Sequence, residues 1–300
     1  MQHLLTAQEV DCLRHECYRL HADLANQGID LCNQDCMLEP DGNLPPEGAP
    51  ARTDAESYLQ VRCKAHCARS REIMEGLLMH KLPSAVLRVL GYDDLDSIAA
   101  SCCPLLFNEH YVVKPSRRAG RFAWHTDAAH QHEAALCLGG PSNVDSDALL
   151  EYVSFWCPLD DIDSTNGALV LLPRSAPQPP FPWQTAANDQ CEAWLRRHAD
   201  GHAHAALVHA GDAVIFSSRL WHCSEPNTSA ADRRVFYCQY SMTPIGGDSP
   251  LACAVRTSPR PAMLEESGVA PIDLPRARSG EDNTEPGTAS DPQRDARRGG

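Results

Sequence analysis

Apolar residues recur at helical spacing through much of the first hundred positions. Thr6 and Glu9 match a capping box, in which the threonine side chain caps the first turn and the glutamate bonds back to it. Apolar side chains then follow at helical spacing until Gly28, a residue that commonly ends a helix. Pro83 can open a short helix at its first position. The pattern predicts helices at residues 7–27, about 55–79 and 83–90, with a Pro- and Gly-rich loop at 36–53.

From Cys103 onward the pattern changes to short apolar runs separated by turn residues. Many short strands without helical periods between them indicate an antiparallel sandwich or jelly roll. Two segments do not fit a tight barrel, 139–147 and a Pro-rich stretch that begins at Pro173, and the second is expected to form a lid. The predicted strands lie at residues 105–114, 122–127, 149–158, 167–172, 205–209, 212–216 and 233–242.

Composition and terminal sequences argue against several classes of partner and location. The chain has 300 residues, of which 43% are hydrophobic, and its net charge of −14 argues against nucleic acid as a partner. No run of about 18 apolar residues is present, so no membrane span is expected. The first residues lack the pattern of a secretory signal, and the last residues are not a peroxisomal address. We therefore expect a cytoplasmic protein.

The 14 cysteines are numerous for a chain of this length. Without a secretory signal they are expected to be reduced thiols and not a disulfide framework. Cys63, His66 and Cys67 invite a zinc interpretation, but their spacing does not match the common zinc pairs. Because Cys63 and Cys67 are one helical turn apart in an amphipathic segment, core cysteines are the favoured interpretation.

A metal site is predicted around His125 and Asp127. The two residues stand two positions apart in a predicted strand, so their side chains should project to the same side. His222, which follows another predicted strand, offers a third ligand. Two imidazoles and one carboxylate form the facial triad of non-haem Fe(II) oxygenases. The chain carries 14 His and 40 Asp plus Glu, so a His-x-Asp tripeptide alone is weak evidence.

Arg233 starts the strand that follows the turn-rich loop after His222. If the strands on either side of this loop pair as a hairpin, Arg233 returns to the neighbourhood of His222. There an arginine can bind a carboxylate through two hydrogen bonds, and Ser224 can add a hydroxyl. A metal triad beside such a carboxylate clamp suggests 2-oxoglutarate as co-substrate.

Several spaced motifs then occur in order, and together they resemble the phytanoyl-CoA dioxygenase family of Fe(II)/2-oxoglutarate oxygenases over roughly residues 104–242. Arg233 follows His222 by 11 positions (233 − 222), which is the usual interval of that family. The motifs are Val113-Lys114-Pro115, Trp124-His125-Thr126-Asp127, Asp160-Asp161, Asn166-Gly167-Ala168-Leu169, Leu172-Pro173, Gly211-Asp212 and His222-Cys223-Ser224-Glu225-Pro226-Asn227.

The resemblance implies a role for each matched residue. It implies that iron is bound by His125, Asp127 and His222, and that Arg233 and Ser224 hold the far carboxylate of 2-oxoglutarate. It also implies that Trp156, Asn108 and Phe122 line the co-substrate or substrate cavity. With O₂ as oxidant, the implied activity is hydroxylation or a related oxidation of a small-molecule substrate, with release of succinate and CO₂.

The chain departs from the family pattern at Pro173-Arg174-Ser175-Ala176, where a Pro-Gly-Ser-His sequence is usual. That loop borders the substrate mouth, so the departure bears on the substrate and not on the metal. Because Asp127 is present, halogenation is disfavoured, since halogenating relatives carry a small residue at that position.

Two alternatives from other classes remain open at this point. One is a non-catalytic jelly-roll protein that keeps a metal site for binding or sensing. The other is a zinc hydrolase that uses the same three ligands. Arg233 separates the hydrolase from the oxygenase, because a hydrolase needs no clamp for a co-substrate.

The expected architecture is mainly β with flanking helices, and the family resemblance implies a double-stranded β-helix of the jelly-roll or cupin-like type. The tail contains no aromatic residue and no Val, Ile, Leu or Met, so it should be disordered. The expected divisions are an N-terminal helical region (1–102), a catalytic β core (103–250) with a lid insertion (173–204), a C-terminal extension (251–274) and a disordered tail (275–300).

Overall fold

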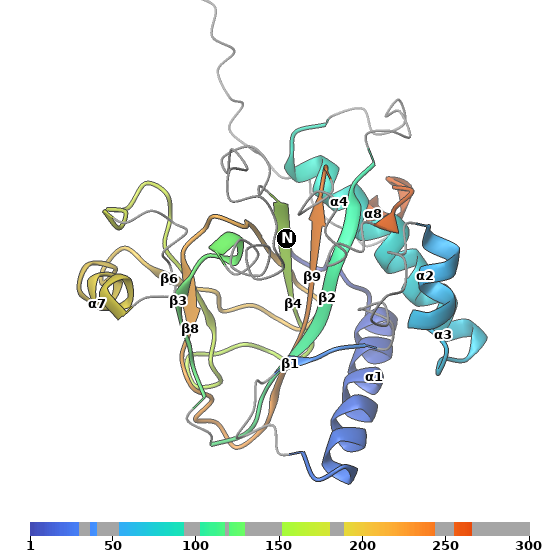
Figure 1. Cartoon of the computed structure of the whole chain (residues 1–300), viewed down its shortest axis with the longest axis horizontal. Coiled ribbons are helices and arrows are strands. Elements are labelled where there is room, and N and C mark those ends of the chain that lie inside the picture. The colour runs from blue at the N-terminus through green and yellow to red at the C-terminus, as the bar shows by residue number, and fades with distance from the viewer. Residues whose placement is uncertain are drawn as a thin grey trace, which may run out of the picture.

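The computed structural model describes residues 1–29, 37–40, 54–92, 103–117, 120–129, 152–180, 189–243 and 255–265 (Figure 1). Its helices are α1 (Ala7–Asn26), α2 (Ala55–Arg62), α3 (Ala68–Glu75), the π-helix η1 (Gly76–Lys81), α4 (Leu82–Val89), α7 (Asp189–His198) and α8 (Ala262–Glu265). Its strands are β1 (Met37–Leu38), β2 (Leu105–Lys114), β3 (Phe122–His125), β4 (Tyr152–Pro158), β5 (Leu169–Leu171), β6 (His204–Ala205), β7 (Val214–Ser217), β8 (His222–Ser224), β9 (Arg233–Ser241) and β10 (Val255–Arg256).

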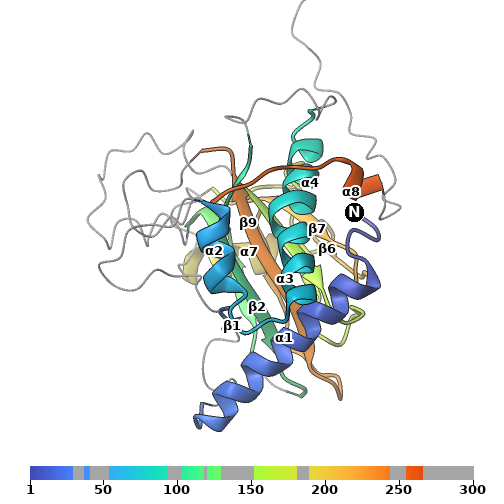
Figure 2. The same cartoon turned by 90° about the vertical axis from the view of Figure 1, so that its right-hand side faces the viewer.

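The strands form two antiparallel sheets. The larger sheet has the order β1-β2-β9-β4-β7, with β10 also paired to β2, and the smaller sheet has the order β3-β8-β5-β6. Figures 1 and 2 show the helices of the N-terminal part over one face of the larger sheet, while the smaller sheet lies on its other side. The predicted mainly β fold, a double-stranded β-helix with N-terminal helices, is confirmed.

The larger sheet is buried on both faces, and strand alternation assigns a different role to each face. Along β9, Phe236, Cys238 and Tyr240 point toward the helices and join the main hydrophobic core. The intervening residues Tyr237 and Gln239 line a cavity on the opposite face. A long strand that is buried on both faces therefore has an apolar row for packing and a second row for the site.

The helical layer confirms part of the sequence prediction. Helix α1 begins after Thr6 with the predicted capping box, in which the Thr6 hydroxyl accepts from the Glu9 amide and Glu9 bonds back to Thr6. The prediction of one long helix at 55–79 is wrong. The chain turns at 63–67, because His66 leaves the helical path to bond with Glu16 of α1. A tertiary contact outweighs the helical periodicity there.

Two smaller expectations are also corrected. Met37 and Leu38, assigned to a loop, form the edge strand β1, which pairs with β2. Cys63 packs in the core as expected, whereas Cys67 is exposed, and neither belongs to a cluster of metal-ligating side chains in the described part of the chain. Every cysteine that the structure describes is a free thiol.

A buried charged network fastens the helical layer to the larger sheet. The Arg62 guanidinium of α2 donates to Glu16 of α1 at 2.6 Å and to Glu109 of β2 at 2.6 Å. Tyr58 and Tyr111 donate their hydroxyls to the same two carboxylates. Burial alone would raise the pKa of Glu16, but the charge of Arg62 and the hydrogen bonds it accepts lower that pKa overall.

The predicted disordered tail lies outside the described residues, as does 181–188 within the expected lid. The lid, the extension and the domain boundaries stay predictions. No helix in the described part of the chain is both long and apolar enough to cross a membrane.

We expect Arg62→Met to lower the free energy of unfolding by about 3–5 kcal/mol, because it leaves two buried carboxylates without their cation. Arg71 is a matched control, since its ion pair with Glu56 is exposed and Arg71→Met should cost less than about 1 kcal/mol. Urea denaturation of both variants measures the difference. Equal, small losses would show that the network does not hold the layers together.

Candidate metal centre

The two histidines of the predicted triad face each other across paired strands. His125 ends β3 and His222 begins β8, and the two residues are direct partners in the antiparallel register. Their rings lie 4.1 Å apart between centroids. This placement follows from the short strands of the smaller sheet, which bring two distant segments of the chain to the same point.

Asp127 reaches the histidines by a different route from the one predicted. Strand β3 stops at His125, so strand alternation does not place the carboxylate. Asp127 instead opens a short helical turn, whose Ala128 amide donates to the Ser218 carbonyl at 3.0 Å. Even so, one ligand atom from each of His125, Asp127 and His222 lies within 4.8 Å of the others. The predicted three residues come together, although the predicted strand geometry is wrong.

The two oxygens of Asp127 have different surroundings. Oδ2 accepts hydrogen bonds from Ser154 Oγ at 2.6 Å, from the Tyr237 hydroxyl and from Gln239 Nε2 at 3.3 Å. Oδ1 faces the histidines, 3.5 Å from His222 Nε2 and 4.0 Å from His125 Nε2. One oxygen is therefore held by the larger sheet while the other is directed at the centre of the triad.

The backbone sets which nitrogen of each histidine carries the proton. His125 Nδ1 lies 2.7 Å from the Ala123 carbonyl, and His222 Nδ1 lies 2.9 Å from the Leu220 carbonyl. Because a carbonyl can only accept, each Nδ1 donates, which leaves each Nε2, on the side of Asp127, to bind a metal or a proton. Metal-binding histidines are oriented in this way in proteins.

The donor set fits a divalent transition metal. The Asp127 side chain is only 11% exposed, and a carboxylate in such surroundings needs positive charge or hydrogen bonds to stay ionised. Burial alone would raise the pKa of Asp127, but His222, His125 and the hydrogen bonds from Ser154 and Tyr237 lower it overall. A metal held by these two imidazole nitrogens and one carboxylate oxygen would have positions left for further ligands, as in facial-triad sites.

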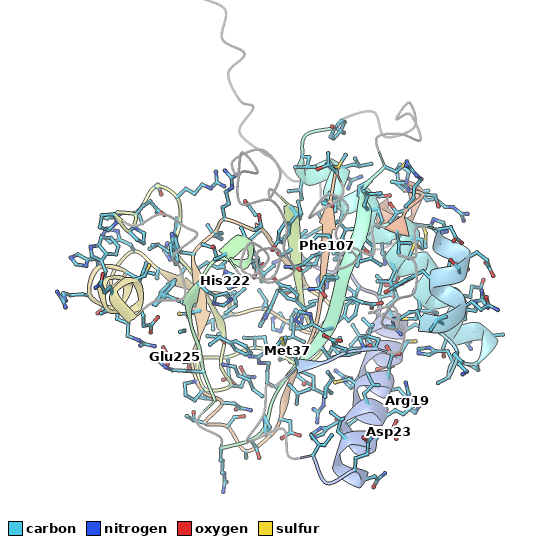
Figure 3. All side chains as sticks on the ribbon, viewed as in Figure 1. Arg19, Asp23, Met37, Phe107, His222 and Glu225 are labelled. Carbon is cyan, nitrogen blue, oxygen red and sulfur yellow. The ribbon has the colours of Figure 1, made fainter. Side chains whose placement is uncertain are left out.

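A cavity of about 510 Å³ surrounds the triad, which is a typical size for a small-molecule site. Figure 3 marks two of its lining residues, His222 of the smaller sheet and Met37 of the larger. All of the predicted site residues line this cavity: His125, Asp127, His222, Arg233, Ser224, Trp156, Asn108 and Phe122.

Arg233 lies in the same cavity, although the predicted hairpin is wrong. His222 and Ser224 belong to β8 of the smaller sheet, whereas Arg233 begins β9 of the larger sheet, so the connecting loop crosses between the sheets. Arg233 is 1% exposed, donates from Nη2 to the Gly167 carbonyl at 3.0 Å, and lies 5.5 Å from the Trp156 ring centre. The described lining of the cavity therefore includes a buried cation.

Gly167 is required by the close packing behind Arg233. It has a φ of +80°, which side-chain-bearing residues rarely adopt. A Cβ at this position would stand 2.6 Å from the Glu225 carbonyl oxygen and 2.9 Å from Lys114. The Asn-Gly pair of the sequence motif thus brings the Gly167 carbonyl within reach of the guanidinium.

Sequence reasoning missed several lining residues, among them Met37, His110, Tyr152, Tyr237 and Gln239. A signal for two of them was present, because Tyr237 and Gln239 follow Arg233 at even intervals along one strand and must share its face. Met37 carried no such signal, since its short strand lies in a segment whose composition resembles a loop.

A double-stranded β-helix that gathers two histidines and an aspartate in an interior cavity defines a jelly-roll protein with a metal site of the oxygenase type. The sequence profile of the phytanoyl-CoA dioxygenase family matches residues 1–235, so the chain belongs to that family. Membership in this family supports the conclusion that the protein is an oxygenase. The match includes the N-terminal helices, which lie before the stretch of roughly 104–242 that carries the resemblance in the sequence.

Several solved structures are similar to the chain. AviO1 from Streptomyces viridochromogenes Tue57 is 21% identical, with 79% of this chain and 86% of AviO1 covered and a TM-score of 0.47. The carbocyclase SnoK from nogalamycin biosynthesis is 17% identical, with coverages of 79% and 76% and a TM-score of 0.45. EctD from S. alaskensis is 17% identical, with coverages of 79% and 70% and a TM-score of 0.47. None of the curated proteins compared with the chain matches it.

We expect Tyr237→Phe to weaken the binding of a divalent metal roughly 10- to 100-fold, because the residues that orient a metal ligand affect affinity on that scale. The variant removes one donor to Asp127 Oδ2 and leaves the ring in place. Tyr240→Phe is the control, since its hydroxyl donates to the Leu78 carbonyl on the opposite face. Calorimetric titration with Co(II) compares them. An unchanged affinity in Tyr237→Phe, or an equal loss in Tyr240→Phe, would contradict this role.

Proposed function

We propose that the protein is an Fe(II)- and 2-oxoglutarate-dependent dioxygenase that hydroxylates or otherwise oxidises a small molecule and releases succinate and CO₂. The observation that carries this proposal is the convergence of His125, Asp127 and His222 within 4.8 Å, inside a cavity that also contains Arg233. The family membership supports it independently.

The buried arginine supports 2-oxoglutarate as the co-substrate. Arg233 lies against the Trp156 ring and is shielded from water, where a charged hydrogen bond to a carboxylate is stronger than at the surface. Ser224 lines the same cavity from the smaller sheet. A dicarboxylate that binds the metal at one end can thus place its far carboxylate between these two side chains.

The chain's own residues prepare the reaction. The triad would hold Fe(II) through two nitrogens and one oxygen, and Fe(II) bound there supplies the capacity to activate O₂. The hydrogen bonds to Asp127 Oδ2 keep the carboxylate from turning. Phe122, Trp156 and Leu169 make the surrounding wall apolar, which excludes water from the co-substrate.

We expect His125→Ala, Asp127→Ala and His222→Ala each to abolish Fe(II)-dependent conversion of 2-oxoglutarate to succinate while the fold survives. His202→Ala is the control, because His202 is exposed and is not among the residues that line the cavity. Succinate formation and metal content measure the effect. Activity near wild type with iron still bound would show that the changed residue is not a ligand. If the wild-type protein binds metal without turning over 2-oxoglutarate, a sensing protein or a zinc hydrolase is favoured instead.

We expect Arg233→Ala to raise the KM for 2-oxoglutarate by roughly 30-fold or more, because truncating one partner of a desolvated charge pair costs about 2–5 kcal/mol. Arg233→Lys should recover only part of the loss, since an ammonium group lacks the planar fork. Iron affinity should change little. The measurement is succinate formed against 2-oxoglutarate concentration at saturating Fe(II).

Arg234 provides the control for this experiment. It lies on the opposite face of β9, where its guanidinium pairs with Asp160 and Asp232 and stacks 4.1 Å from the Tyr18 ring centre. Arg234→Ala should therefore lower stability without raising the KM for 2-oxoglutarate. If neither arginine changes this KM, the case for 2-oxoglutarate is lost.

A further inference from the structure

The cavity has two ends that lie on opposite sides of the triad. Tyr237 of β9 donates a hydrogen bond to Asp127 and so marks the level of the triad. Arg233 precedes Tyr237 by four residues on this strand, which is about 13 Å. Gln239 follows Tyr237 by two residues, on the side away from Arg233, and pairs with Asn108 of β2. The arginine end suits the far carboxylate of 2-oxoglutarate, so the Asn108 end is left for the substrate.

His110 stands out among the polar residues on this side of the cavity, where it lies opposite Tyr237 and two residues from Asn108 along β2. Asn108 and Gln239 bond to each other, with 2.8 Å between Asn108 Nδ2 and Gln239 Oε1. In the part of the chain that the structure describes, the His110 imidazole makes no hydrogen bond and no ion pair. It is half-buried, lines the cavity and packs on the Tyr237 ring with 4.9 Å between centroids. A polar ring that contacts a residue bonded to Asp127 is therefore available to a ligand.

Among the residues that the structure describes, the lining of the substrate end carries no formal charge at physiological pH. Burial lowers the pKa of His110 to about 4, although Asp127 acts in the opposite direction, so the imidazole is neutral. Of the described lining residues, Asp127 and Arg233 are the ones with a formal charge, and both belong to the metal and co-substrate positions. Apart from the two histidines of the triad, the other polar groups of the described lining are amides, hydroxyls, a thiol, the Trp156 indole and the His110 imidazole.

We propose that the substrate is uncharged at the end that enters this cavity and bears an oxygen, in a hydroxyl, ether or carbonyl group, that His110 holds by a hydrogen bond. The inference rests on the proposed function, because it assigns to the substrate the space that the co-substrate leaves. His110 is a specificity-determining residue in this arrangement, and it orients the molecule beside the triad.

The physical reason is the cost of desolvation. A carboxylate or ammonium group that enters this end loses its water and, among the described lining residues, meets no charged side chain apart from those at the metal and co-substrate positions, a cost of several kcal/mol. A neutral oxygen loses much less and recovers a hydrogen bond from the imidazole. The described lining of this end therefore disfavours a charged substrate group and provides a site for a polar but uncharged one.

Ligand-observed NMR on the protein loaded with Zn(II) and 2-oxoglutarate tests this, because Zn(II) prevents turnover. The probes are cyclohexanol, cyclohexanecarboxylate and cyclohexylammonium, which share a ring and differ in charge. We expect cyclohexanol to bind and the two ions not to bind. His110→Phe, which keeps the ring against Tyr237, should weaken cyclohexanol binding roughly 2- to 10-fold, as for one neutral hydrogen bond. His15→Phe, at an exposed position of α1, should have no effect.

The outcomes separate this inference from the proposed function. The signals of 2-oxoglutarate report its own binding in the same sample, and their failure to respond to the wild-type protein would count against the proposed function itself. If 2-oxoglutarate binds but cyclohexanol does not, or an ionic probe binds as well, the neutral subsite is overturned. The same holds if His110→Phe keeps the full affinity for cyclohexanol while 2-oxoglutarate binding is intact.

Discussion

The structure depends on strand alternation in a sheet that is buried on both faces. Along β9 each residue that faces the helices is followed by one that faces the cavity, so packing and chemistry share a single strand. The neighbours Arg233 and Arg234 show how strict this constraint is, because Arg233 lies in the cavity whereas Arg234 pairs with Asp160 on the face toward the helices. A slip of one residue in register would exchange them and turn Tyr237 and Gln239 away from Asp127.

The metal centre lies between the two sheets and draws on both. His125 and His222 come from the smaller sheet, whereas the hydrogen bonds that hold Asp127 come from Ser154 of β4 and from Tyr237 and Gln239 of β9. A metal bound to all three ligands would connect the sheets at the centre of the cavity. Ligands that bind only the folded state stabilise it, so the same contacts that prepare the chemistry also favour the closed sandwich.

Sequence reasoning succeeded where the determining interactions are local. Helix α1 follows from its capping box and apolar spacing, and strand β2 matches its predicted limits at Leu105 and Lys114. It failed where distant contacts decide the outcome. The helix predicted at 55–79 breaks because His66 bonds to Glu16, and β8 pairs with β3 and β5 instead of forming a hairpin with β9.

The site illustrates the same division in a different way. The three ligands and Arg233 were recognisable because their residue types and spacing carry the chemistry wherever the strands lie. His110 and Met37 were not, because a histidine in an apolar strand and a methionine in a Pro-rich segment have many ordinary explanations. These two residues line the cavity because the strand register places His110 opposite Tyr237 and Met37 opposite Val112. The residues that define the reaction can thus be found in the sequence, whereas those that select the substrate emerge only when the sheet is assembled around them.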